Sequence, residues 1–237
     1  WRQQKQFVAD ASHELKTPLT VILTNTELLQ SPDYDAAQKQ TFLSGIDAMA
    51  KQMRALVERL LELARAENEQ AAHLFAPCDF SQITESSALL FEAALFERGL
   101  TLQTELEPDI AVSGDERQLS QLVEIYLDNA RKYASGGTVA VRLSRYGKSR
   151  CRLSVSNEGA ALSAQTLRQI FDRFSRADAA RTRDGSFGLG LSIAQAIVQT
   201  HGGSVWAESE NGVNTFFAEL PVLSGHEKRQ EMPKKGI

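Results

Sequence analysis

The sequence predicts a helical hairpin followed by an α+β sandwich domain, in which helices cover one face of a sheet. Three observations lead to this fold class. Residues 1–70 hold a single glycine and are rich in Ala, Leu, Glu and Gln, which is helical composition. Their apolar residues recur at spacings of three and four. From about residue 79, helical patterns are interspersed with short alternating strand patterns and turn residues.

The helical hairpin is predicted by two apolar seams with a breaker at 31–35 between them. The seam of the first stretch is Val8, Leu15, Leu19, Ile22, Thr26 and Leu29. The seam of the second stretch is Phe42, Ile46, Met49, Met53, Leu56, Leu60 and Leu63. Such narrow seams are typical of coiled coils. Because two helices of this kind cannot close a core alone, we expect two hairpins to pair as a four-helix homodimer.

The second domain is expected to mix helices with mostly hairpin-connected strands. Helices are expected at 81–98, 116–134 and 189–200, and strands at 100–106, 138–143, 151–156, 204–209 and 215–220. Asn211-Gly212 predicts a tight turn between the last two strands. The domains are therefore expected to be a hairpin at 1–70, a linker at 71–78, the sheet domain at 79–222 and a polar tail at 223–237.

Composition excludes several classes of protein. Of 237 residues, 42% are hydrophobic, which favours a folded core, and the net charge of −4 argues against a protein that coats nucleic acid. Two distant cysteines, Cys78 and Cys151, exclude a disulfide scaffold and a thiolate zinc site. No apolar stretch is long enough to span a membrane, so we expect no membrane contact in this fragment. Because the chain opens on Trp1, we expect a cytoplasmic piece of a longer, membrane-anchored protein.

One histidine lies beside the seam of the first helix. His13 falls one position off that seam and is expected to face water, where its imidazole is a nucleophile. Glu14 could hold one ring nitrogen protonated, and Thr17 lies one turn beyond His13 on the same face. Taken alone, such a residue is more often an ordinary surface histidine.

A glycine cluster immediately before the last helix suggests phosphate binding. Its members are Gly185, Gly188, Leu189 and Gly190. Backbone N–H groups approach phosphates closely at glycines, and a helix N-terminus adds positive potential. Five arginines at 168–183, Arg176 among them, could supply cations, although a solvated charged loop is the simpler interpretation of each. Upstream, the Asn129 amide oxygen suits Mg²⁺, with Lys132 on nearly the same helix face.

The string from Phe7 to Leu19, with His13-Glu-Leu-Lys-Thr-Pro18 inside it, closely resembles the phospho-acceptor box of two-component sensor histidine kinases. The resemblance implies that His13 is the phosphorylated residue. It also implies that Glu14 is the general base of autophosphorylation and that Thr17 helps to dephosphorylate the partner, a response-regulator protein.

Four further segments resemble the nucleotide motifs of that family, in the family's order: 128–133 the N box, 157–159 the first glycine box, 170–174 the F box and 185–190 the second glycine box. The resemblance covers residues 7–221 and implies the Bergerat-type ATP-binding fold of Hsp90, gyrase and the mismatch-repair ATPases. It implies these contacts with Mg²⁺ and ATP: Asn129 to the metal, Lys132 and Arg176 to the phosphates, Tyr133 to the nucleotide pocket, Asn157 to the adenine, and Gly159, Gly185, Gly188, Leu189 and Gly190 in the glycine boxes.

Three positions depart from the family pattern. Asn157 replaces an aspartate, Ala161 replaces a glycine, and Ile125 stands where a further asparagine is common. In the related ATPases that third position holds a water-activating glutamate. Glu124 lies about 140° from Asn129 around the helix and is poorly placed to substitute. Transfer to His13 is therefore expected over hydrolysis.

The leading hypothesis is a histidine kinase that autophosphorylates His13 from Mg·ATP and passes the phosphoryl group to a response-regulator aspartate. It could also act as the phosphatase of that regulator. A different class stays open, namely a pseudokinase scaffold or a phosphatase-only dimer in which the altered glycine box impairs ATP binding. An ATP-hydrolysing machine of the wider superfamily would turn over ATP independently of His13.

Overall fold

The computed structural model describes residues 2–67, 75–175 and 187–223. The chain divides into two compact units, Trp1–Leu63 with Arg173–Leu189, and Ala64–Asp172 with Gly190–Ile237. Within the described residues, none of the helices combines the length and the apolar character needed to cross a bilayer.

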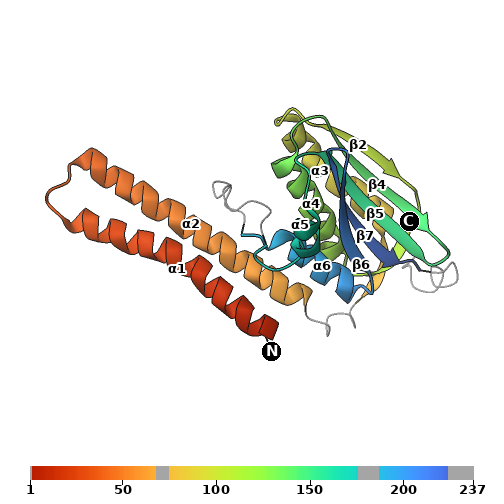
Figure 1. Ribbon diagram of the computed structural model, residues 1–237, viewed down its shortest axis with the longest axis horizontal. Coiled ribbons are helices and arrows are strands. Elements are labelled where there is room, and N and C mark those ends of the chain that lie inside the picture. The colour runs from red at the N-terminus through yellow and green to blue at the C-terminus, as the bar shows by residue number, and fades with distance from the viewer. Residues whose placement is uncertain (1, 68–74, 176–186, 224–237) are drawn as a thin grey trace, which may run out of the picture. The chain divides into compact units, whose positions relative to one another are not determined.

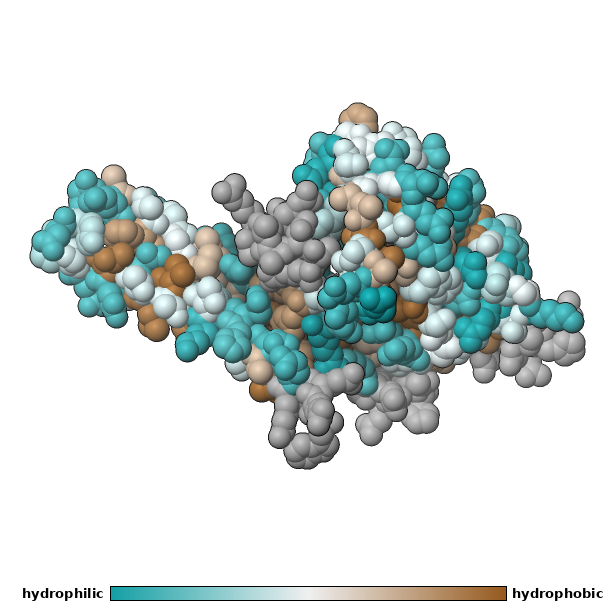
Figure 2. Space-filling model, viewed as in Figure 1, coloured by the Kyte–Doolittle hydropathy of each residue, from teal (hydrophilic) through white to brown (hydrophobic). Residues whose placement is uncertain are grey.

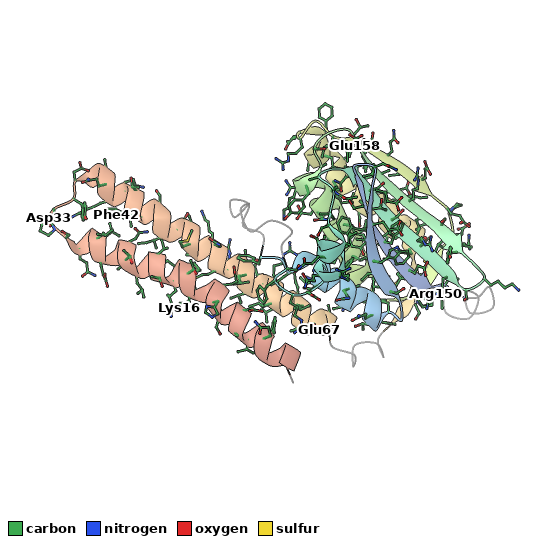
Figure 3. The ribbon with its side chains drawn as sticks, viewed as in Figure 1. Lys16, Asp33, Phe42, Glu67, Arg150 and Glu158 are labelled. Atoms are coloured by element: carbon green, nitrogen blue, oxygen red, sulfur yellow. The ribbon has the colours of Figure 1, made fainter. Side chains whose placement is uncertain are left out.

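The first unit contains a hairpin of two long helices, α1 (Arg2–Gln30) and α2 (Ala36–Ala66, whose last residues belong to the second unit) (Figure 1). The start of α2 is closed by a reciprocal cap. The Gln38 N–H donates to Asp35 Oδ1 at 2.8 Å, and the Asp35 N–H donates to Gln38 Oε1 at 3.0 Å. Tyr34 packs edge-on against Phe42, 5.0 Å between ring centroids, beside the turn that carries Asp33 (Figure 3). The predicted breaker at 31–35 is confirmed.

The two seams are only partly covered within one chain. Leu56 and Leu63 are buried, whereas Val8 is 58% and Leu19 45% exposed. The other large apolar residues exposed on the hairpin are Val21, Leu23, Leu43, Val57 and Leu61. Figure 2 shows hydrophobic residues interrupting the hydrophilic surface of the hairpin. A single hairpin therefore leaves apolar area in water, at a cost of about 25 cal/mol per Å² relative to burial.

The second unit contains a five-stranded sheet in the order β2-β4-β5-β7-β6, with helices α3, α4 and α6 on one face (Figure 1). Strand β2 pairs parallel with β4, and the other pairs are antiparallel. The strands are β2 (Thr101–Leu106), β4 (Thr138–Tyr146), β5 (Arg150–Glu158), β6 (Ser204–Glu210) and β7 (Val213–Pro221). The helices are α3 (Phe80–Phe96), α4 (Glu116–Tyr133), α5 (Ala164–Gln169) and α6 (Gly190–Thr200).

The core lies between the sheet and its helices. Alternate residues of the central strands are buried: Val139, Val141 and Leu143 on β4, Cys151, Leu153 and Val155 on β5, and Phe216, Ala218 and Leu220 on β7. Helix α4 buries Leu119, Leu122, Val123, Tyr126 and Leu127 against them. Burial raises the pKa of the Cys151 thiol to about 12, so this thiol is unreactive at neutral pH. The predicted α+β fold class is confirmed, as is the β6–β7 hairpin across Asn211 and Gly212.

Two strands were not predicted. β1 (Ala76–Asp79) and β3 (Ala111–Gly114) form a separate antiparallel pair. Within the expected linker 71–78, the backbone of Ala76, Pro77 and Cys78 lies opposite β3. The rest of that linker lies largely outside the described residues. At the other boundary, the Leu223 N–H donates to the Ala111 carbonyl at 2.8 Å, and the remainder of the expected tail is not among the described residues.

The C-terminus of α6 holds both ends of the connection between α2 and β1. Thr200 Oγ1 donates to the Ala66 carbonyl at 2.7 Å, and the ring of the buried His201 stacks on Phe75 with 4.3 Å between centroids. His201 Nε2 accepts from the Asp115 N–H at 3.1 Å, and its Nδ1 lies 2.7 Å from the Ile197 carbonyl. Both contacts require a neutral ring with the proton on Nδ1.

These contacts predict that the fold weakens in mild acid. Burial lowers the pKa of His201 below 6.5, although the Ile197 carbonyl and the Asp115 charge oppose that shift. Above pH 6.5 the ring is neutral in the folded and unfolded states alike. As pH falls below 6.5, the unfolded chain takes up the proton first, so the free energy of unfolding falls by up to about 1.4 kcal/mol per pH unit until the folded pKa is reached.

Urea unfolding followed by circular dichroism between pH 7.5 and pH 5 would measure this loss, and His201→Gln is the control. Glutamine cannot titrate, so the variant should show a flatter dependence in that window. Equal slopes for the two proteins would contradict the role given to His201.

Candidate functional site

His13 lies in the middle of α1 and is exposed, as its offset from the seam predicts. Glu14 is half-buried, and Thr17 is exposed on the same helix face as His13. The Thr17 hydroxyl donates to the His13 carbonyl at 3.5 Å, which is a weak hydrogen bond. Pro18 lies inside the helix and is buried. The imidazole is thus accessible, on a backbone held by the helix.

A second group of expected site residues lies along one face of α4. Ile125, Asn129 and Tyr133 follow each other at intervals of four, which places them on one side of the helix. At one end, the Ile125 side chain lies close to Gly190, the first residue of α6: a Cβ added to Gly190 would lie 3.6 Å from it. At the other end, the Tyr133 carbonyl lies close to Gly159: a Cβ added to Gly159 would lie 3.2 Å from the carbonyl oxygen. Asn129 is half-buried and lies one turn from Ile125 and one turn from Tyr133 along α4.

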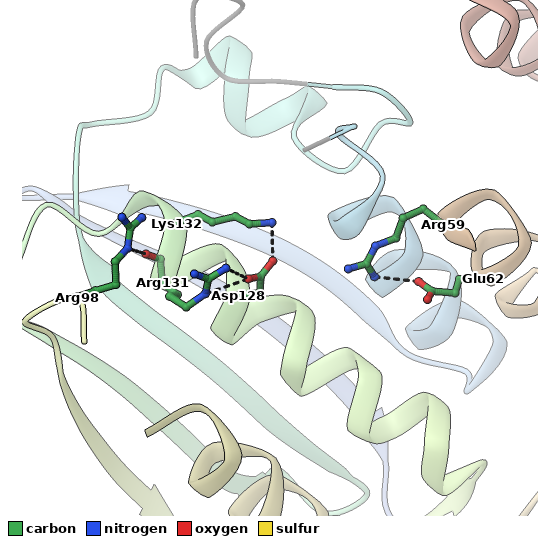
Figure 4. A network of polar contacts seen from close by, with 6 residues as sticks. All are labelled: Arg59, Glu62, Arg98, Asp128, Arg131 and Lys132. Atoms are coloured by element: carbon green, nitrogen blue, oxygen red, sulfur yellow. Dashed lines mark hydrogen bonds and ion pairs between the residues drawn. The ribbon is translucent and has the colours of Figure 1, made fainter. Parts of the chain in front are cut away.

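Lys132, next to this face, is engaged by an acidic neighbour. Its Nζ lies 2.6 Å from Asp128 Oδ2, and Arg131 Nη2 lies 2.7 Å from Asp128 Oδ1 (Figure 4). Burial alone would raise the pKa of Asp128, but the hydrogen bonds and charges of Lys132 and Arg131 outweigh it and hold that pKa below its usual value. Asp128 is therefore ionised at neutral pH.

Two buried asparagines face each other where β5 and β7 pair. Asn157 is 2% and Asn214 is 6% exposed, and they are direct partners in the register. Asn157 Nδ2 donates to the Glu158 carbonyl at 2.9 Å, and Asn214 Nδ2 donates to the Ala160 carbonyl at 3.0 Å. Asn214 Oδ1 is buried and has no hydrogen-bond partner among the described residues. Such an atom is costly unless something else donates to it.

Gly159 lies close to the asparagine pair, where a side chain would be crowded. A Cβ there would lie 3.0 Å from Asn214 Nδ2 and 3.3 Å from Asn157 Nδ2. Sequence reasoning selected Asn157 and Gly159 but missed Asn214. The sequence did contain a signal for Asn214. Alternate residues of β7 point inward, and Asn214 is a polar residue at an inward position, whereas Phe216, Ala218 and Leu220 at the other inward positions are apolar.

The glycine cluster is described only in part. Arg176 and Gly185 lie outside the described residues. In the first unit, Gly188 has a φ of 69°, and a Cβ there would lie 2.6 Å from the Ser175 carbonyl oxygen, while Leu189 is buried. Gly190 begins α6 in the second unit. The second unit thus brings together Asn129, Lys132, Tyr133, Asn157, Gly159 and Gly190.

Comparison with protein families accounts for both groups of residues. Residues 3–69 match the family described as the His Kinase A (phospho-acceptor) domain. Residues 114–224 match the family described as histidine kinase-, DNA gyrase B- and HSP90-like ATPases. The chain belongs to the sensor histidine kinases.

Individual relatives agree with this assignment. Over 220 residues the histidine kinase is 31% identical to the sensor protein DltS of Streptococcus agalactiae, covering 93% of this chain and 55% of DltS. Over 217 residues it is 35% identical to the sensor histidine kinase YkoH of Bacillus subtilis, covering 90% of this chain and 46% of YkoH. The chain thus spans about half the length of these curated relatives.

A solved structure shares the fold. The histidine kinase ThkA, crystallised in complex with the response regulator protein TrrA, superposes with a TM-score of 0.72 at 20% identity, covering 95% of this chain and 63% of that one. The phospho-acceptor match contains His13, and the ATPase match contains Asn129, Lys132, Asn157 and Gly190. The family assignment confirms the predicted resemblance, whereas it tests no single residue of the site.

Proposed function

We propose that this histidine kinase core phosphorylates its own His13 from Mg·ATP and then passes the phosphoryl group to an aspartate of a response regulator. The observation that carries the proposal is the exposure of His13 within the segment that matches the phospho-acceptor domain. An exposed imidazole is the nucleophile that this chemistry needs. The same chain supplies an ATPase-type unit.

The residues at the asparagine pair fit a purine base. Asn214 Oδ1 is a buried acceptor without a partner among the described residues, and an exocyclic amino group is a donor that would satisfy it. Asn157 is buried beside it and can replace the family's aspartate as an acceptor, because its amide oxygen also takes a hydrogen bond. The close approach of Gly159 keeps side-chain atoms away from this edge. We therefore place the adenine here, with Tyr133 bordering its pocket.

The phosphate end is assigned to α4 and the start of α6. Asn129 would ligate Mg²⁺ through its amide oxygen, and Lys132 would bind the phosphates. Mg²⁺, when bound, neutralises charge that develops on the transferred phosphoryl group. Gly190 places the N-terminus of α6 nearby, where its free N–H groups favour anions. Arg176, Gly185, Gly188 and Leu189 complete the proposed set.

The transfer step balances as an in-line displacement. The lone pair on Nε2 of His13 forms a bond to the γ-phosphorus, the bond from that phosphorus to the bridging oxygen breaks, and ADP leaves. In this proposal Glu14 would take the Nδ1 proton as positive charge develops on the ring. Ile125 is apolar and nearly buried where a water-activating carboxylate would be needed, so hydrolysis is disfavoured. Thr17, on the face of His13, would position water when the regulator is dephosphorylated.

Two partners follow from the hairpin. The exposed Val8, Leu19, Val57 and Leu61 support pairing of two hairpins in a four-helix bundle, which would remove them from water. A monomer mass by light scattering at micromolar concentration would contradict this pairing. The complex of ThkA with TrrA supports a response regulator as the second partner. The membrane anchor expected outside this chain stays a prediction.

Incubation with γ-³²P-labelled ATP and Mg²⁺ tests the proposal. We expect protein-bound label that is labile in acid and stable in alkali, as a phosphoramidate is, and that moves to a purified receiver domain. A chain that incorporates no label and binds no nucleotide at millimolar ATP would instead be a scaffold or a phosphatase-only dimer. Label that resists acid would show a different acceptor chemistry.

A further inference from the structure

Asp128 divides its two carboxylate oxygens between two cations on the same helix. Oδ1 accepts from Arg131 through Nε at 3.2 Å and Nη2 at 2.7 Å, and Oδ2 lies 2.6 Å from Lys132 Nζ (Figure 4). The side chains of Asp128, Arg131 and Lys132 are between 24% and 32% exposed. Water therefore weakens these pairs less than it weakens fully exposed ones.

The two cations are held differently. Arg131 binds through two nitrogens of a planar guanidinium, and its own carbonyl accepts from Arg98 Nε at 3.3 Å. Lys132 makes a single contact at the end of a flexible four-carbon chain. The Arg131 pair is thus the more fixed of the two, and the Lys132 ammonium is the group that can leave at a smaller cost.

Lys132 also lies within reach of the proposed phosphate site. It follows Asp128 by four residues and Asn129 by three, so both lie one turn back along α4 and about 100° apart around the helix. One ammonium group cannot make short contacts with the Asp128 carboxylate and with phosphates beside Asn129 at the same time. The contact with Asp128 therefore opposes the contact with nucleotide.

We propose that Asp128 competes with the nucleotide phosphates for Lys132 and thereby lowers the affinity for Mg·ATP and Mg·ADP. The proposal rests on the nucleotide site assigned above. Binding exchanges one anion for another at Lys132, and Arg131 keeps the released carboxylate paired. Asp128 is thus a positioning residue that holds the lysine in the nucleotide-free protein and favours release of ADP after transfer.

Titration calorimetry of Asp128→Asn tests this competition in the full chain. The variant should bind Mg·ATP about three- to tenfold more tightly than wild type, because Lys132 no longer leaves a carboxylate. The gain should shrink as salt is raised, since salt screens the charges involved. Adenosine carries no phosphate, so its affinity should not change, whereas a structural defect of the pocket would alter it.

Two further variants complete the design. Lys132→Met should remove the gain, so that Asp128→Asn has no effect on ATP affinity in that background. Asp47→Asn is the matched control, because Asp47 and Lys51 form the same i,i+4 pair at 2.6 Å on α2 and its loss should leave ATP affinity unchanged. If Asp128→Asn does not fold, Asp128→Ser removes the same charge and should give the same result.

Unchanged or weaker binding of ATP by both Asp128 variants, in a wild-type chain that does bind ATP, would overturn the competition alone. A gain that persists in the Lys132→Met background would overturn it as well. A wild-type chain that binds no nucleotide would instead refute the proposed function.

Discussion

His13→Gln is expected to abolish incorporation of phosphate while leaving ATP affinity unchanged. Glutamine keeps the polarity and roughly the length of the side chain, but its amide nitrogen donates its lone pair to the carbonyl and is no nucleophile. His13 is exposed, so the substitution should change the free energy of unfolding by no more than about 0.5 kcal/mol. The loss would therefore be chemical and not structural.

Label on the denatured protein after gel electrophoresis, together with calorimetric ATP affinity, would measure both expectations. The chain has three other histidines, His73, His201 and His226. His73→Gln with His226→Gln in one protein is the control and should keep full labelling, whereas His201 is buried and inaccessible. Acid-labile label that survives in His13→Gln would place the acceptor elsewhere and refute the proposed function.

The sequence predicts well the features that depend on residues close together in the chain. Spacings of three and four define the seam of α1 and place His13 at its edge, because helix geometry is the same at every position. Asn211-Gly212 predicts its hairpin from two residues, since both favour the backbone that a tight turn needs. The helix predicted at 116–134 begins at Glu116, and the structure shows its cap, since the Asp115 carboxylate accepts from the N–H groups of Arg117 and Gln118.

The features that sequence reasoning missed depend on partners distant in the chain. β1 and β3 span four residues each, too few to show an alternating pattern, and each is a strand because the other is opposite. The role proposed for Asn214 depends on the register that sets it against Asn157. The i,i+4 spacing of Asp128 and Lys132 is enough to suggest an ion pair. The proposed competition between Asp128 and nucleotide for Lys132 follows only once Asn129 and Lys132 are assigned to one site.

Asn129→Ala is expected to lower the rate of autophosphorylation by about 10²-fold or more, as the proposed Mg²⁺ ligand is lost. Its effect on the fold should have the opposite sign. Asn129 lies inside α4, where alanine is the better helix former by about 0.5 kcal/mol, so the free energy of unfolding should hold or rise. Activity and stability would then move apart, which a folding defect cannot produce.

The dependence of ATP affinity on Mg²⁺ distinguishes an Asn129 that binds the metal from one that only contacts the nucleotide. In wild type, ATP should bind more tightly with Mg²⁺ than with EDTA, and in Asn129→Ala that difference should largely vanish. Glu124→Ala is the matched control on the same helix, because Glu124 is also half-buried but points about 140° away from Asn129, and it should keep the wild-type rate and metal dependence. If Asn129→Ala retained the full difference between Mg²⁺ and EDTA, the metal would have to be held by other residues, and Asn129 would lose its place in the site.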